Sequence, residues 1–293
     1  MLFKTKQVSL GILRLDYDYP PSPGDIDCPD TFDYDVYYRV IPGLTFSMCQ
    51  SGNIPKYIEN RIIDAVWWLN DMNVDGITGD CGFMIHIQKI VCQHTIKPVF
   101  MSSLIQLPTI VKAYDKHKQI AIFTANGASL QNMKKLIYEL CDVDMNDNRF
   151  IFVGCENVPG FEAVALGKKV NTKLVQPNIV VKSLEVIKQY PNVSCILMEC
   201  TELPPYSDAV RKETGLPVFD SITCADYFMS SVKDNPRFGL NNWQKSWDKT
   251  QEKYSYGCHL TEDEKTKLVN PVHSTNNGNV ESINENTWWC FKF

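Results

Sequence analysis

The alternation of apolar and polar positions along the chain predicts strands and helices that follow one another in turn. Val8–Leu15 is an apolar stretch of strand length, and Ile58–Met72 gathers apolar side chains on one helical face. The pattern predicts further strands at Asp75–Asp80, Lys97–Met101, Ile120–Thr124, Arg149–Gly154, Ser194–Glu199 and Leu216–Asp220, and further helices at Ser129–Cys141, Leu174–Gln189 and Ala225–Val232. Because strands that alternate with helices form parallel sheets, we expect an α/β fold.

A repeat inside the chain divides these elements into two sets. When the sequence is shifted by 119 residues, Asn73–Ser102 aligns without a gap with Asn192–Ser221, and 10 of 30 positions are identical. Chance gives about two identities at ordinary residue frequencies. The identical pairs are Asn73/Asn192, Val74/Val193, Ile77/Ile196, Cys81/Cys200, Val91/Val210, Thr95/Thr214, Pro98/Pro217, Val99/Val218, Phe100/Phe219 and Ser102/Ser221. Two copies of a strand–helix–strand unit predict two lobes related by a pseudo-two-fold axis, with the active site in the cleft between them.

The repeat and the change in composition along the chain suggest three regions. We expect residues 1–112 together with 210–234 to form the first lobe and residues 113–209 to form the second. Residues 235–293 are polar with scattered tryptophans, which predicts an extension that packs on the surface or on another subunit. Within it, Asn270–Asn286 is rich in Asn and Ser, a composition typical of disordered segments.

Composition and charge exclude several classes of function. Hydrophobic residues make up 44% and charged residues 22% of the 293, which is ordinary for a globular protein. The net charge of −5 and the lack of long basic runs argue against a nucleic-acid partner. No apolar stretch is long enough for a membrane span or for a signal peptide, so we expect a cytoplasmic protein. The 11 cysteines show neither zinc-ligand spacing nor a disulfide framework, so we expect no metal site.

Cys81 and Cys200 differ from ordinary buried thiols because they occupy corresponding positions of the repeat. Each follows a predicted strand and precedes a helix, and ligands of parallel α/β sheets bind beyond the carboxyl ends of the strands. The positive potential of a helix N-terminus is expected to lower the pKa of such a thiol from about 8.5. The pseudo-two-fold axis brings the two thiols to opposite sides of one cleft. Two opposed bases suit the removal of a proton beside a carboxylate, by a racemase or by an eliminase.

The residues around these cysteines resemble a known enzyme superfamily. Cys200-Thr201-Glu202 is similar to the second cysteine motif of the aspartate/glutamate racemase superfamily. A closer resemblance, from Val8 to Phe228, is to the algal and coral dimethylsulfoniopropionate lyases of the Alma family. It is carried by GILRLDYDYPP (Gly11–Pro21), ITGDCGF (Ile77–Phe83), KPVFMSS (Lys97–Ser103), FTANG (Phe123–Gly127), VPGFEAV (Val158–Val164) and ECTELPPYSD (Glu199–Asp208). The resemblance implies the two-lobed racemase fold, cleavage of dimethylsulfoniopropionate to dimethyl sulfide and acrylate without metal or organic cofactor, and assembly as a homotetramer.

One departure from the amino-acid racemases bears on the substrate. Those enzymes usually carry Asn-Thr after the first cysteine, whereas Cys81 is followed by Gly82 and Phe83. The change removes polar groups that an amino acid would use, and an aromatic face suits a methylated sulfonium cation. Further aromatic residues follow the first strand, and we expect two or three of them at most to touch the substrate, with Tyr17 and Tyr38 as the preferred pair. The six are Tyr17, Tyr19, Phe32, Tyr34, Tyr37 and Tyr38.

The resemblance leads to a mechanistic hypothesis. Cys200, as a thiolate, removes the proton α to the substrate carboxylate, and Cys81 positions the substrate or balances protons on the opposite face. The amides that follow the two cysteines hold the carboxylate and stabilise the developing enolate-like charge. The other candidate substrate-binding residues are Thr124, Asn126, Thr201, Glu202 and Ser102.

An acidic residue precedes each of the two cysteines. Strand alternation directs Asp80 and Glu199 to the far side of each sheet, where we expect a supporting hydrogen bond or ion pair.

Three other functions compete with the lyase. An amino-acid or hydantoin racemase with the same two cysteines is the first alternative, and the Gly82-Phe83 departure argues against it. A ligand-binding relative without turnover is the second, and a thiol-redox enzyme is the third.

Overall fold

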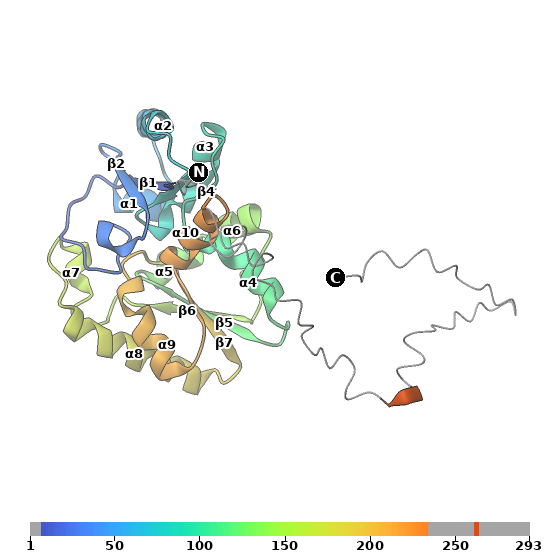
Figure 1. Cartoon of the computed structure of the whole chain (residues 1–293). Coiled ribbons are helices and arrows are strands. Elements are labelled where there is room, and N and C mark those ends of the chain that lie inside the picture. Colours follow the sequence, from blue (N-terminus) through green and yellow to red (C-terminus); the bar gives the residue numbers. More distant parts are fainter. Residues whose placement is uncertain (1–6, 234–260, 264–293) are drawn as a thin grey trace, which may run out of the picture. The chain divides into compact units, whose positions relative to one another are not determined.

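The computed structural model describes residues 7–233 and 261–263 (Figure 1). The predicted C-terminal extension, including its Asn- and Ser-rich segment 270–286, lies outside the described residues except for 261–263. The described strands are β1 (Ser9–Arg14), β2 (Asp35–Val40), β3 (Gly76–Gly79), β4 (Val99–Phe100), β5 (Gln119–Thr124), β6 (Phe150–Gly154), β7 (Val193–Met198) and β8 (Val218–Phe219). The α-helices are α1 (Phe46–Ser51), α2 (Lys56–Asp71), α3 (Gln88–Gln93), α4 (Leu107–Ala113), α5 (Gly127–Asn132), α6 (Lys134–Cys141), α7 (Glu162–Ala165), α8 (Thr172–Gln189), α9 (Ser207–Thr214) and α10 (Ser221–Ser230). Short 3-10 helices lie at Pro29–Thr31, Gly82–Ile87, Ser103–Gln106 and Pro204–Tyr206.

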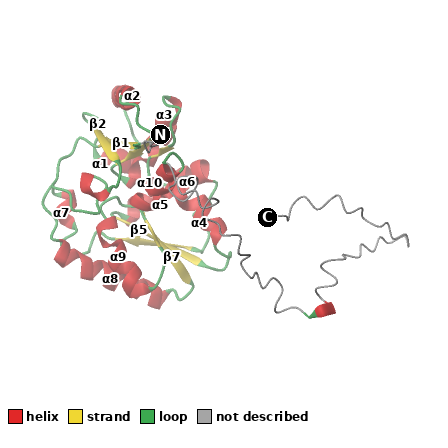
Figure 2. Ribbon diagram, viewed as in Figure 1, coloured by secondary structure: helices red, strands yellow, loops and turns green. Residues whose placement is uncertain are grey.

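Two sheets of the same topology form the centre of the two lobes (Figure 2). The first has the strand order β2-β1-β3-β4 and the second β6-β5-β7-β8, and every recorded strand pair is parallel. The register repeats as well. Ile77 pairs with Val99 in the first sheet, and Ile196 pairs with Val218 in the second, 119 residues further along. The α/β fold class and the two lobes that the internal repeat predicts are therefore confirmed.

Helix α2 shows how the apolar pattern produces the packing. Its buried side chains recur every three or four residues and so share one face, which packs against the first sheet. They are Ile58, Ile62, Ala65, Val66 and Leu69. Burial of each Ile, Val or Leu side chain among them contributes about 1.5–3 kcal/mol, so this face stabilises the packing of α2 on the first sheet.

Two elements differ from the prediction. The single helix predicted at Ser129–Cys141 is two helices, α5 and α6, which meet at Met133. Strand β2 is not predicted by the pattern, because it lies at the edge of its sheet and none of its side chains is fully buried. Without a buried face, an edge strand lacks the clear alternation of apolar and polar residues that identifies a strand in a sequence.

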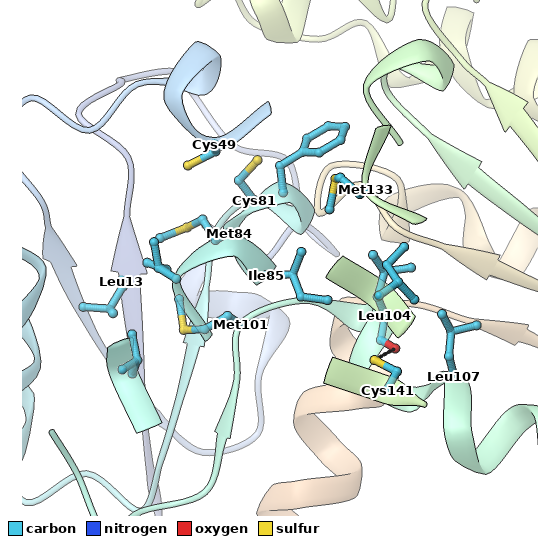
Figure 3. Close-up of a cluster of buried hydrophobic side chains, with 14 of the residues drawn as sticks. Leu13, Cys49, Cys81, Met84, Ile85, Met101, Leu104, Leu107, Met133 and Cys141 are labelled. Atoms are coloured by element: carbon cyan, nitrogen blue, oxygen red, sulfur yellow. Dashed lines mark hydrogen bonds between the residues drawn. The ribbon is translucent and has the colours of Figure 1, made fainter. Parts of the chain in front are cut away.

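One hydrophobic cluster continues from the first lobe into the second (Figure 3). It includes Leu13 of β1 and Ile122 of β5, with Leu104 and Leu107 at the segment that joins the lobes. Cys81 belongs to the same cluster. The lobes therefore share a core, and the walls of the space between them are held by packing on both sides.

The last elements of the described chain are divided between the lobes. Helix α10 packs on the first sheet, where Ala225 and Met229 join a cluster with Leu10 and Ile12. Residues 210–219 were assigned above to the first lobe, but they include the end of α9 and strand β8, which pairs with β7 of the second sheet. The full division into regions stays a prediction. No helix in the described part of the chain has both the length and the apolar character that crossing a bilayer requires.

Candidate active site

A cavity of about 440 Å³ lies where the carboxyl ends of the two sheets meet, and both cysteines of the repeat line it. The first lobe contributes Phe46, Ser47 and Gln50 of α1 and the run Cys81, Gly82 and Phe83 after β3. The second lobe contributes Ala125, Asn126, Glu199, Cys200 and Glu202 at strand ends, and Glu156, Phe161, Glu162, Val164 and Ala165 from the segment around α7. Cys81 and Cys200 therefore line one space between the lobes, as the sequence predicts.

The two strand ends touch each other directly. The Thr201 hydroxyl donates a hydrogen bond to the backbone oxygen of Asp80 in the opposite lobe. Gly82 lies against Glu199 so closely that a Cβ atom on Gly82 would be 2.1 Å from Glu199 Oε1. Glycine at this position is therefore required by the approach of the second lobe. This explanation differs from the predicted one, in which Gly82 replaces a polar residue to suit the substrate.

Cys200 has a proton acceptor beside it. Its thiol donates a hydrogen bond to Glu202 Oε2 at 2.8 Å, and Thr201 Oγ1 lies 3.2 Å from the same oxygen. Burial, reinforced by the nearby Asp25 carboxyl, raises the pKa of Glu202 to about 8. Burial, with the charges of Glu202 and Glu199, raises the pKa of the Cys200 thiol well above its usual value. The thiol is thus protonated in the ligand-free site and paired with the group that can take its proton.

Cys81 lies in an equally dry environment. Burial raises the pKa of its thiol well above the usual value, and the neighbouring Cys49, Glu202 and Glu199 act in the same direction. Figure 3 shows Cys81 in the shared core with Cys49 and Met84.

The expectation that helix N-termini lower both thiol pKa values is wrong. The segment after Cys81 is the 3-10 helix Gly82–Ile87, which leads into α3, and a turn separates Cys200 from the 3-10 helix Pro204–Tyr206, which leads into α9. Neither cysteine therefore lies at the first turn of an α-helix, where the effect of the dipole is strongest. Burial and neighbouring acids therefore control the thiols.

Glu199 makes the supporting hydrogen bond that the sequence predicts, but it is not separated from the site. The residue is among those that line the cavity, although 0% of it is exposed. Glu199 Oε2 accepts a hydrogen bond from the Thr124 hydroxyl at 2.7 Å, whereas Oε1 has no partner among the described residues. Burial raises the pKa of this carboxyl to about 7, against the opposing effect of the Thr124 hydrogen bond.

Asp80 has the supporting role that the sequence predicts. Both of its carboxylate oxygens accept the backbone N–H of Leu15, at 3.1 and 3.0 Å. Arg14 Nε lies 3.8 Å from the same carboxylate and 2.9 Å from Asp27. Asp80 therefore fixes the end of β1 against the end of β3, behind Cys81.

The remaining candidates divide into residues at the cavity and residues away from it. Phe83 and Asn126 line the cavity. Asn126 uses its side-chain oxygen to cap α5 through Ser129 N, so its amide nitrogen is left as a donor. Thr124 and Thr201 are buried beside the cavity, and their hydroxyls are already donated to Glu199 and to the Asp80 backbone.

Besides Thr124 and Thr201, three further predicted binding residues do not line the cavity. Ser102 caps the 3-10 helix Ser103–Gln106 by accepting the N–H of Leu104 at 3.2 Å. The Tyr38 hydroxyl donates to the backbone oxygen of Ile26 at 3.0 Å. Tyr17 lies behind the wall, where its ring contacts Phe46 at 4.7 Å between centroids and its hydroxyl donates to the Val164 backbone. Ser102 and Tyr38 therefore hydrogen-bond to backbone groups and do not line the cavity. Tyr17 contacts Phe46 and Val164, which do line it.

The aromatic surface of the cavity comes from other residues. None of the six aromatic residues between Tyr17 and Tyr38 lines the cavity, whereas Phe46, Phe83 and Phe161 do. Phe161 and Glu162 belong to VPGFEAV, one of the stretches that carry the resemblance, so the motif itself was the available signal. Phe46 and Glu156 had no such signal in the quoted motifs.

The cavity is acidic as well as aromatic. Four glutamates line it, and no Lys, Arg or His occurs among its lining residues in the described part of the chain. Glu199 and Glu202 are buried, whereas Glu156 and Glu162 are exposed at its edge. Within residues 7–233 and 261–263, no group of three or more His, Cys, Asp or Glu side chains is arranged to hold a metal ion.

Comparison with known proteins identifies close relatives. No protein family model matches the chain. Dimethylsulfoniopropionate lyase 7 of Emiliania huxleyi (strain CCMP1516) is 56% identical over 272 residues, which cover 92% of this chain and 80% of that protein. Dimethylsulfoniopropionate lyase of Durusdinium sp. clade D is 48% identical over 267 residues, which cover 91% and 89%. Allantoin racemase from Klebsiella pneumoniae has a similar structure, with a TM-score of 0.51 at 11% identity over 77% of this chain and 87% of that one, and this likeness concerns the fold alone.

Proposed function

The chain belongs to the dimethylsulfoniopropionate lyase family, and we propose that it cleaves dimethylsulfoniopropionate to dimethyl sulfide and acrylate by β-elimination. The observation that supports this reaction best is the cavity itself. Thiols from corresponding positions of two repeats line it, and one of them, Cys200, is hydrogen-bonded to a carboxyl that can accept its proton. A small substrate with a proton beside a carboxylate fits this constellation.

In the proposed reaction, the ionised Glu202 carboxylate takes the Cys200 thiol proton, and the resulting thiolate removes the proton on the substrate carbon next to the carboxylate. The electron pair of that C–H bond forms the C=C bond of acrylate. The C–S bond breaks at the same time or next, and its electron pair leaves on neutral dimethyl sulfide. This leaving group needs no acid, because it departs uncharged. Cys200 is a thiol again, and Glu202 returns its proton to solvent.

The substrate carboxylate needs donors in a cavity without basic side chains. The first N–H groups after Cys81 and Cys200 start helical or turn segments and lack helical partners, so they are suited to this role. The Asn126 side-chain amide adds a third donor. Thr124 and Thr201 act indirectly in this proposal, since their hydroxyls hold Glu199 and the Asp80 backbone. Oriented amides of this kind stabilise an enolate-like charge as it develops.

Cys81 lies on the first-lobe side of the cavity, opposite the second-lobe strand end that carries Cys200. In an elimination only one base is needed, so we assign Cys81 to positioning and to proton balance on the other face. In a racemase both thiols exchange protons with the substrate. Solvent deuterium appearing at the α carbon of a chiral amino acid or hydantoin, with inversion, would favour this alternative.

The test is the release of dimethyl sulfide into the headspace above freshly reduced enzyme and dimethylsulfoniopropionate. Wild type should release it, and the Cys81→Ser, Cys200→Ser double variant should not. Cys92→Ser is the matched control, because Cys92 is exposed and does not line the cavity. No release from folded, reduced wild type would contradict the lyase proposal. Equal release by the double variant would contradict the site.

The assembly and the location are further parts of the proposal. We propose a homotetramer on the strength of the family resemblance, and sedimentation of the full chain tests it. We propose a cytoplasmic location because all nine cysteines of the described residues are free, which is typical of a reducing compartment. Fractionation of the source cell with an antibody to the chain tests this location. No metal or organic cofactor enters the proposed reaction.

A further inference from the structure

The internal repeat allows Glu199 to be compared with its counterpart in the other lobe, Asp80. Asp80 and Glu199 are corresponding residues, each one position before a cysteine of the pair. The Asp80 carboxylate is satisfied by the Leu15 amide and lies 3.8 Å from Arg14 Nε. Glu199 is as deeply buried, but only one of its oxygens has a partner in the described residues, and that partner is the neutral Thr124 hydroxyl. Both Asp80 oxygens therefore have a hydrogen-bond partner, whereas one Glu199 oxygen has none among the described residues.

The unpartnered Glu199 oxygen, Oε1, lies against Gly82 at the point where the lobes meet. Glu199 and Gly82 both line the cavity, and Glu199 Oε1 occupies the place where a side chain on residue 82 would begin. The absence of a Cβ on Gly82 therefore leaves room for the Glu199 carboxyl beside the cavity. Ionisation of a buried, unpartnered carboxyl costs free energy, and a cation bound against the carboxylate offsets that cost.

The lining of the cavity leaves that cation to be supplied by the ligand. No basic side chain lines it in the described part of the chain, while Glu202, Glu156 and Glu162 add to its negative potential. The pKa of Glu199, raised by burial to about 7, is in accord with a carboxyl that awaits a positive partner. Phe83 and Phe161 line the same cavity, and aromatic side chains suit the methyl groups of such a cation.

We infer that Glu199 is the counter-ion of the substrate sulfonium group and so selects a substrate with a cationic leaving group. This inference rests on the proposed lyase function and identifies the residue that determines its specificity. The same arrangement explains how product leaves. Once the C–S bond breaks, the positive charge is gone, and the acrylate anion remains near Glu199 without the cation that balanced the negative charge.

The test uses trimethylsulfonium, a cation with no carboxylate and no β-elimination available to it, and acrylate, the anion alone. Trimethylsulfonium should inhibit dimethyl sulfide release by wild type competitively, and acrylate should inhibit weakly. In Glu199→Gln, the inhibition constant for trimethylsulfonium and the KM for dimethylsulfoniopropionate should each rise about tenfold or more, as expected for a desolvated charge pair. Acrylate inhibition should not weaken. Glu185→Gln, the same change at an exposed position of α8, should alter none of these constants.

The outcomes separate this inference from the lyase proposal. Wild-type release of dimethyl sulfide with an unchanged trimethylsulfonium constant in Glu199→Gln would overturn the inference and leave the function standing. A loss of acrylate affinity without a loss of trimethylsulfonium affinity would also overturn it, because Glu199 would then hold the carboxylate as a neutral acid. If wild type releases no dimethyl sulfide, calorimetric binding of trimethylsulfonium to wild type and Glu199→Gln decides the inference alone. If Glu199→Gln does not fold, Glu199→Asp, which withdraws the charge by one methylene, must weaken trimethylsulfonium binding without weakening acrylate binding.

Discussion

Replacement of Gly82 by alanine tests whether the close approach of the two lobes makes the site. The added Cβ would lie 2.1 Å from Glu199 Oε1 and 2.2 Å from the Glu199 backbone oxygen. Real Cβ atoms essentially never approach another atom within 3.0 Å, so each neighbour must move by about 1 Å. The carboxyl can rotate away from the new methyl group. The backbone oxygen can move only with the chain around it, and Cys200 is the next residue.

The size of the effect follows from this displacement. A shift of about 1 Å in a reacting group lowers turnover by about a hundredfold, and overpacking of a tight contact costs about 1–3 kcal/mol. We therefore expect Gly82→Ala to lower kcat for dimethyl sulfide release by about two orders of magnitude. We expect the free energy of unfolding to fall by about 1–3 kcal/mol. Headspace assays at saturating substrate and urea titrations measure the two quantities on the same preparation.

Gly215→Ala is the matched control for the loss of stability. Gly215 ends α9 with φ of 70°, and no atom lies within 4 Å of the Cβ that alanine would add. The left-handed conformation costs an alanine about 1–2 kcal/mol without any contact with the site. Turnover of folded Gly215→Ala should match wild type. The reasoning is refuted if Gly82→Ala keeps wild-type kcat, or if Gly215→Ala loses as much activity as Gly82→Ala.

Four further results are expected. Glu202→Gln should lower kcat about a hundredfold in initial-rate assays, because Cys200 loses its proton acceptor; a wild-type rate would count against the assignment. Ser102→Ala and Tyr38→Phe should keep wild-type KM, since neither residue lines the cavity, and a raised KM would return that residue to the site. Urea titrations of ligand-free enzyme should show that the free energy of unfolding falls between pH 4.5 and about 8. The folded state holds the Glu199 and Glu202 protons up to pKa values of about 7 and about 8, whereas the unfolded chain releases them near 4.5. An increase in the free energy of unfolding over that range would contradict these shifts. The rise of kcat with pH should occur at a lower pH than the rise of kcat/KM, and coincident profiles would show that substrate leaves the thiol pKa unchanged.

The repeat explains why so much of the architecture can be predicted from the sequence. Identical residues 119 positions apart predict two copies of one unit, and the pairs Ile77–Val99 and Ile196–Val218 show that the copies keep even their strand register. A residue at one place in the unit must then recur at the same place in the other lobe. This geometric requirement, together with binding at the carboxyl ends of parallel strands, brings Cys81 into the same cavity as Cys200.

The place of Glu199 at the cavity could not be predicted, because the rule of strand alternation applies only within a strand. Strand β7 ends at Met198, so Glu199 lies just beyond the pleated backbone that fixes alternate directions. Its position depends on Thr124, 75 residues away, and on the space left by Gly82 of the other lobe. Such long-range packing leaves no local signal in a sequence.

The predicted lowering of the thiol pKa values is wrong for a related physical reason. A helix N-terminus is a local feature that a sequence pattern can predict, whereas burial depends on every element that closes the site. Cys81 and Cys200 become dry only when both lobes are assembled, and the same assembly brings Glu199 and Glu202 beside them. Both the loss of water and the nearby acids raise the thiol pKa values, and together they outweigh the potential of the short helical segments.

The raised pKa values and the proposed cation site together account for how a buried thiol can act as a base. In ligand-free enzyme, a thiolate at Cys200 would lie in a dry site beside Glu202 and Glu199, which is why the proton stays on sulfur. A sulfonium group bound against Glu199 adds a positive charge within the same cavity, and a nearby cation favours the ionised form of each acid. Glu199 then ionises as its partner arrives, and Cys200 can give its proton to Glu202 while the substrate is in place. When dimethyl sulfide leaves, the positive charge disappears, and Cys200 is already a thiol because it has taken the substrate proton. The base is therefore strongest when the substrate is bound, and this is the reason that the pH profile of kcat should lie below that of kcat/KM.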